Sequence, residues 1–140
     1  MFDSRVSRPE ADRAGATALR RMSQLGLVAG FILAAVVGVL TLTPVPAPQV
    51  PQGFQFDKVY HLIAFAAVVF PVIATGPRRW VWVVPLAMVY GGAIEIIQPY
   101  VNRERELMDF VANCLGVMLG TLAGFRVNRR LSAWFGARAV

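Results

Sequence analysis

Four long apolar runs dominate the sequence and restrict the chain to one class of fold. Each is roughly 17 to 21 residues long, enough to cross about 30 Å of hydrocarbon as an α-helix. The runs cover residues 22–42, 59–75, 80–98 and 107–125. The connections between them are short, so consecutive helices are expected to pack antiparallel. The sequence therefore predicts an all-α integral membrane bundle of four transmembrane helices.

Composition supports this class and excludes an ordinary soluble domain. Of the 140 residues, 56% are hydrophobic and only 16% are charged. These values are typical of membrane proteins. A cleaved signal peptide is the competing interpretation of the first run, but the run is too long and "PVPAP" is a poor cleavage site. The single cysteine, Cys114, excludes an internal disulfide and is expected to be a small packing residue.

The distribution of positive charge predicts the orientation in the membrane. Arginines are concentrated in residues 1–21, at 78–79 and in 126–138, all on one side of the predicted helices. Because cytoplasmic flanks retain Lys and Arg, both termini are predicted to be cytoplasmic. The chain then divides into a basic N-terminal segment (1–21), a transmembrane domain (22–126) and a basic tail (127–140). Attraction to membrane lipids accounts for the net charge of +6, so no nucleic-acid partner is expected.

The polar residues of the predicted helices gather at the opposite, extracytoplasmic end. They are spaced by three or four residues, so those on each helix share one face. Three such faces at one depth predict a single pocket. Its members are Asp57, Lys58 and His61, then Glu95 and Gln98, then Asp109 and Asn113.

A row of glycines indicates which way the last helix faces. Gly116, Gly120 and Gly124 recur every four residues on the same face as Asp109 and Asn113. Rows of small residues let membrane helices approach closely. This face is therefore the predicted packing face, and its polar residues are expected to point into the bundle.

Several of these residues also have a structural interpretation. Asp57 could cap a helix N-terminus, Lys58 could extend to the membrane interface, and Asn113 could make one interhelical hydrogen bond. Glu95 fits a structural role least well. A carboxylate costs roughly 2.5 to 3.5 kcal/mol at the membrane centre and somewhat less near its edge, and nothing on its own helix neutralises it.

Together these residues resemble a family signature. The sequence reads "DKVYHLIAF" from Asp57 and "EIIQ" from Glu95, followed by Arg103 and by D-x-x-x-N-x-x-G-x-x-x-G ending at Gly120. This pattern is similar to that of the VanZ-like family of small bacterial membrane proteins, named after a protein associated with teicoplanin resistance. The resemblance implies a place in the bacterial inner membrane and a link to the cell envelope. It selects Arg103 as the pocket arginine, although Arg105 is a second candidate.

The preferred function is binding of, or action on, an anionic or lipid-linked envelope molecule. Lys58 and Arg103 would hold its negative charge, with Asp57, Gln98 and Asn113 as further binding residues. Glu95, His61 and Asp109 are the candidate catalytic groups. The alternative is a non-catalytic membrane protein in which the charged cluster is a helix-packing network or a surface for a partner. No oligomeric state is assigned.

A metal site is a further alternative. Asp57, His61, Glu95 and Asp109 could supply nitrogen and oxygen ligands for a divalent ion. Lys58 and an arginine in the same pocket would repel that ion. No metal and no other cofactor are therefore expected from the sequence.

Overall fold

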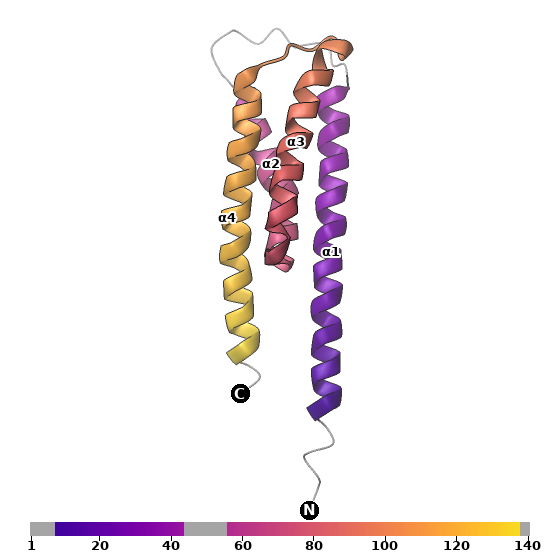
Figure 1. Ribbon diagram of the computed structural model, residues 1–140, viewed down its shortest axis with the longest axis vertical. Helices are drawn as coiled ribbons and strands as arrows, with labels where there is room; N and C mark the ends of the chain where they lie inside the picture. Colours follow the sequence, from indigo (N-terminus) through magenta and orange to yellow (C-terminus); the bar gives the residue numbers. More distant parts are fainter. Residues whose placement is uncertain (1–7, 44–55, 138–140) are drawn as a thin grey trace, which may run out of the picture.

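The structure, a computed structural model, describes residues 8–43 and 56–137, and these ranges are helical apart from short connections. The helices alternate in direction, so the first residue of α1 and the last residue of α4 lie at the same end of the bundle (Figure 1). The parts of the predicted terminal segments and of the loop after residue 43 that fall outside these ranges are not described. The elements are α1 (Arg8–Leu42), α2 (Phe56–Thr75), the 3-10 helix η1 (Pro77–Arg79), α3 (Trp80–Ile97), the 3-10 helix η2 (Gln98–Val101) and α4 (Leu107–Ala137).

All four α-helices are long and apolar enough to cross a membrane. This confirms the predicted all-α class with four helices long enough to span a membrane, and it supports a multi-pass membrane protein. The two outer helices are longer than their apolar runs, because α1 already begins at Arg8 and α4 continues to Ala137. Alanine and arginine favour helix, so a helix need not end where its side chains become polar.

Helix α2 forms the main interfaces of the bundle. It packs most extensively against α4 and next against α1, whereas α1 and α3 make few contacts with each other. Its buried face places Phe65, Val69 and Ile73 in the core, where Ile94 of α3 and Val117 of α4 meet them. The polar end of the bundle is therefore positioned mainly by the α2–α4 pair.

Glycines on α4 allow that pair to approach closely. A side chain added at Gly116 or Gly120 would overlap the backbone carbonyl oxygen of Leu62 or Ala66 on α2. A Cβ atom at Gly124 would lie 2.8 Å from the Cβ atom of Ile73. The face predicted from the glycine row is thus the face that α4 presents to α2.

Candidate functional site

Eight polar residues lie together at the end of the bundle opposite the start of α1. We call them the polar cluster. Five of them are buried, namely His61, Glu95, Gln98, Asp109 and Asn113. The members are Asp57, Lys58 and His61 on α2, Glu95 on α3, Gln98 on η2, Glu106 just before α4, and Asp109 and Asn113 on α4.

His61 joins α2 to α4 near the centre of the cluster. Its Nδ1 atom lies 2.9 Å from Oδ1 of Asn113. An amide oxygen can only accept, so Nδ1 carries the hydrogen and donates it. The other ring nitrogen, Nε2, faces Oδ1 of Asp57 at 3.9 Å and Oδ2 of Asp109 at 3.8 Å. One imidazole thus contacts an amide on one edge and two carboxylates on the other.

Lys58 makes a second link between α2 and the start of α4. Its Nζ atom donates to Oε2 of Glu106 at 2.6 Å and lies 3.4 Å from Oδ1 of Asp109. The Lys58 side chain is 20% exposed, whereas that of Asp109 is 3% exposed. The lysine charge is therefore balanced by two carboxylates of the protein itself.

Glu95 has one weak partner and one unpartnered oxygen. Its Oε2 atom accepts from the backbone N–H of Glu106 over 3.4 Å, while Oε1 is buried with no hydrogen bond. Oε1 of Gln98, Oδ1 of Asp109 and Nδ2 of Asn113 are also buried without a hydrogen bond among the described residues. Buried polar atoms nearly always have partners. All four of these atoms belong to the polar cluster, and within the described ranges only Oδ1 of Asp109 has a charged neighbour, the Lys58 ammonium group at 3.4 Å.

Arg103 adjoins the cluster through its backbone N–H, which donates to the carbonyl oxygen of Gln98 at 3.1 Å, but its side chain bonds to α1. Its Nη1 atom donates to the carbonyl oxygens of Thr41 at 3.0 Å and Leu40 at 3.4 Å, at the end of α1. The last carbonyls of a helix lack internal partners, and a cation there is favourable. Arg105 is exposed. The described side-chain bonds of Arg103 thus cap the end of α1, and its predicted role in holding an anion stays a prediction.

The contacts thus bring together Asp57, Lys58, His61, Asp109 and Asn113, as the spacing predicted. Glu95 adjoins them through Glu106, and Gln98 is buried at the same end. Sequence reasoning missed Glu106 as the main partner of Lys58. Its position three residues before Asp109 was the available indication, because residues three apart share a face when a helix continues.

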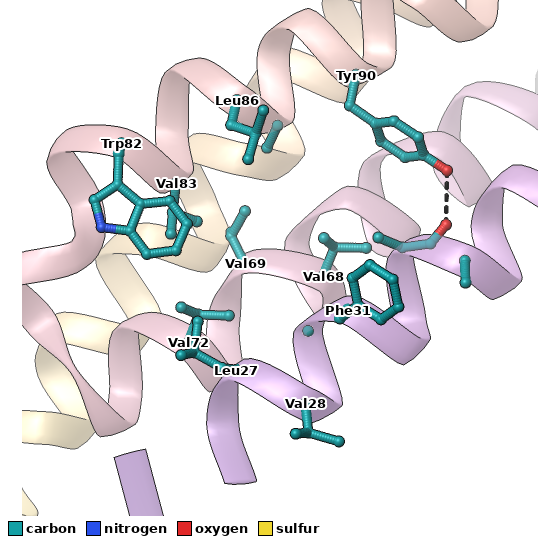
Figure 2. A pocket seen from close by; sticks show the side chains of 14 residues that line it. Leu27, Val28, Phe31, Val68, Val69, Val72, Trp82, Val83, Leu86 and Tyr90 are labelled. Atoms are coloured by element: carbon teal, nitrogen blue, oxygen red, sulfur yellow. Dashed lines mark hydrogen bonds between the residues drawn. The ribbon is translucent and has the colours of Figure 1, made fainter. Parts of the chain in front are cut away.

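A separate apolar pocket of about 690 Å³ lies between α1, α2 and α3 (Figure 2). Among its lining residues, Phe31 is 77% exposed and Leu86 is 59% exposed, so the pocket opens towards the outside of the bundle. At one end, the Tyr90 hydroxyl donates to the Ala34 carbonyl oxygen at 2.7 Å, the bond dashed in Figure 2. The other lining residues are apolar apart from the indole N–H of Trp82: Leu27, Val28, Gly30, Phe31, Ala34, Ala35, Val68, Val69, Val72, Trp82, Val83, Leu86 and Ala87.

Comparison of the chain with family models, with curated proteins and with solved structures found no match. The similarity to the VanZ-like pattern therefore stays a prediction from the motif residues. Function has to be inferred from the polar cluster and from the apolar pocket.

Proposed function

We propose that the chain is a VanZ-like protein of the bacterial inner membrane whose polar cluster binds an anionic or lipid-linked envelope molecule on the extracytoplasmic side. The observation that carries the proposal is the group of three buried polar atoms without a described partner at one end of the bundle, namely Oε1 of Glu95, Oε1 of Gln98 and Nδ2 of Asn113. A buried polar group without a partner costs about 1 to 3 kcal/mol. A ligand that supplies the missing partners would recover this free energy.

The unpartnered atoms favour a particular kind of head group. Glu95 and Gln98 offer acceptor oxygens, and Asn113 offers an N–H donor. Carboxylates outnumber the single ammonium group of Lys58, so a bare anion would be repelled. A head group that carries hydroxyl or amide donors beside its negative charge fits better, and sugars and peptides attached to a lipid phosphate have this character.

The apolar pocket suits the lipid part of such a molecule. Tyr90, at the end of the pocket, lies five residues before Glu95, which is about 7.5 Å along a helix. From Leu27 to Ala35 the pocket extends about 12 Å, close to half the thickness of a hydrocarbon core. An alkyl chain could therefore occupy the pocket while its head group reaches the polar cluster.

The orientation follows from the arginines. Arg78 and Arg79 lie at the end of the bundle opposite the polar cluster, and Arg126, Arg129 and Arg130 lie towards the same end of α4. The positive-inside rule then assigns that end to the cytoplasm. A reporter that is active only outside the cytoplasm should be active when it is fused in the loop after residue 43, and a reporter that is active only in the cytoplasm should be inactive there. Cytoplasmic activity of that fusion would reverse the orientation.

Glu95→Gln tests the binding proposal, with the exposed Glu104→Gln as the matched control. Both proteins are purified in detergent, and binding of a polyprenyl phosphate carrying a sugar is followed by native mass spectrometry. Glu95→Gln should bind at least tenfold more weakly, and Glu104→Gln should bind like the wild type. In cells, tolerance to teicoplanin should fall only for Glu95→Gln. Unchanged binding and tolerance in an inserted Glu95→Gln protein would refute the proposal.

The second candidate is a purely structural network. It is favoured by three contacts between elements, which are Lys58 with Glu106, His61 with Asn113, and Arg103 with Thr41. If the cluster only fixes the bundle, Glu95→Gln should raise the thermal stability, because it removes a buried charge that has one weak partner. Stabilisation without any loss of envelope phenotype would therefore favour this candidate.

A further inference from the structure

Three potential metal ligands converge inside the polar cluster. They are Asp57 and His61 on α2 and Asp109 on α4, and their ligand atoms all lie within 4.8 Å of one another. His61 and Asp109 are buried, whereas Asp57 is exposed at the mouth of the site. The set therefore has a fixed interior and an accessible edge.

The tautomer of His61 favours a cation at this place. Nδ1 donates its hydrogen to Asn113, so in the neutral ring Nε2 carries a lone pair. That lone pair faces carboxylate oxygens of Asp57 and Asp109 at 3.9 and 3.8 Å. These distances are too long for N–H···O hydrogen bonds. Three electron-rich atoms thus surround a space that a metal ion could fill, and an orienting bond of the Asn113 kind is usual for metal-binding histidines.

The dimensions are close to those of a transition-metal site. With bonds of about 2.1 Å, ligand atoms in a tetrahedral site lie about 3.4 Å apart. The three atoms here would need to move inward by several tenths of an ångström, which requires a small shift of the buried His61 and Asp109 side chains as well as of the exposed Asp57. Glu95 is buried, has an unpartnered Oε1 atom and joins the same cluster through the backbone N–H of Glu106, but it is not one of the three converging ligands.

The cations expected to repel a metal both have partners within the protein. Lys58 bonds to Glu106 and approaches Oδ1 of Asp109, which leaves Oδ2 directed at His61. Arg103 caps α1. The cluster has four carboxylates, those of Asp57, Glu95, Glu106 and Asp109, and its one lysine leaves an excess of negative charge.

We propose that Asp57, His61 and Asp109 bind a single divalent transition-metal ion of the Zn²⁺ class, with Asn113 as a positioning residue. One imidazole and several carboxylates form a mixed donor set that suits such an ion. This metal site deepens the proposed function and rests on it for its role. A bound ion would add a positive charge to the polar cluster and so attract the anionic head group that the carboxylates alone repel.

Zn²⁺ binding to the full chain in detergent tests this inference without any envelope ligand. The affinity tag must lack histidine, because His61 is the only histidine of the chain. Equilibrium dialysis should give one tightly bound ion per chain. His61→Gln and Asp57→Asn should each weaken binding at least tenfold, whereas Glu104→Gln should not. Asp57 is 64% exposed at its side chain, so its variant keeps the fold even if the His61 variant does not.

Asn113 has a separate readout. Asn113→Asp retains an acceptor for Nδ1 and should bind Co²⁺ with the visible absorption of the wild type, whereas Asn113→Leu should lose that band. Absence of stoichiometric Zn²⁺ binding, or binding that survives Asp57→Asn, would overturn the metal site. Loss of lipid-linked ligand binding in Glu95→Gln would still support the proposed function in that case, so the two can fail separately.

Discussion

The α2–α4 interface and the space between α1 and α3 show two ways in which apolar helices meet in one bundle. Helices α2 and α4 approach to backbone contact at Gly116 and Gly120 and enclose polar groups. Helices α1 and α3 hardly touch and leave an apolar pocket. In a bilayer, lipid is as apolar as leucine, so apolar side chains alone do not draw helices together. Small residues and interhelical polar contacts therefore determine which helices of the bundle pack closely.

The largest expected effect comes from opening the tight interface. Gly120→Leu would push a side chain into the carbonyl oxygen of Ala66 and the side chain of Val69. Overpacking of this kind costs about 3 kcal/mol or more when backbone must move. Unfolding in mixed micelles should occur at much lower denaturant than for the wild type. Gly15→Leu is the matched control, because nothing lies within 4 Å of a Cβ atom added at that residue, and equal losses in both would contradict the assigned interface.

A smaller loss of stability is expected from a substitution in the polar part of the α2–α4 interface. Asn113→Leu removes the acceptor of the His61 Nδ1 hydrogen. Leaving a buried donor unpaired costs about 1 to 3 kcal/mol. Thermal unfolding should shift to lower temperature than for the wild type. A leucine variant as stable as the wild type would show that the histidine does not depend on this bond.

A smaller loss of stability is expected between α1 and α3, where the helices make few contacts. Tyr90→Phe removes the hydroxyl bond to Ala34 and leaves the ring in place between α1 and α3. One such bond contributes about 1 kcal/mol. Hydrogen exchange should rise in the middle of α1 and stay constant in α4. Tyr60→Phe is the control, since Tyr60 is 67% exposed, and faster exchange in both variants would mean that the effect is not local.

The smallest effect is expected at the end of α1. Arg103→Gln removes a cation from the carbonyl oxygens of Leu40 and Thr41. A charge at a helix end contributes roughly 0.3 to 1 kcal/mol and is screened by salt. The stability difference from the wild type should therefore shrink as salt is added. Arg105→Gln should cause no change, and a larger effect of Arg105→Gln would reassign the capping residue.

The helices and the polar face could be predicted because both depend on short spacings. Apolar length defines a spanning helix, and a three- or four-residue repeat places Asp109, Asn113 and the glycines on one face. The polar partners could not be predicted in the same way. Lys58 bonds to Glu106, which is 48 positions away in the sequence. Arg103 bonds to Thr41 of α1, which is 62 positions away. These partners depend on the conformation of the loop before α4, which cannot be predicted from the spacing of residues within one helix.

The apolar pocket was also beyond local reasoning, because it exists only where two helices diverge. Its two neighbouring glycines on α1, Gly26 and Gly30, do have the four-residue spacing of close packing, and they contact α2. They hold α1 against α2 on one side, while the Tyr90 hydroxyl bond links it to α3 at the end of the pocket. The pocket therefore begins beside this close approach, since Gly30, Val68 and Val72 also line it.

The exposed side of this pocket has a consequence for the route by which a ligand arrives. Phe31 and Leu86 face outwards, where the surroundings of a spanning helix are lipid. A lipid-linked molecule would therefore reach the protein by diffusion in the plane of the bilayer rather than through water. Its encounter rate would depend on its surface density in one leaflet and on the fluidity of the chains around α1 and α3, two quantities that the cell adjusts when it remodels its membrane.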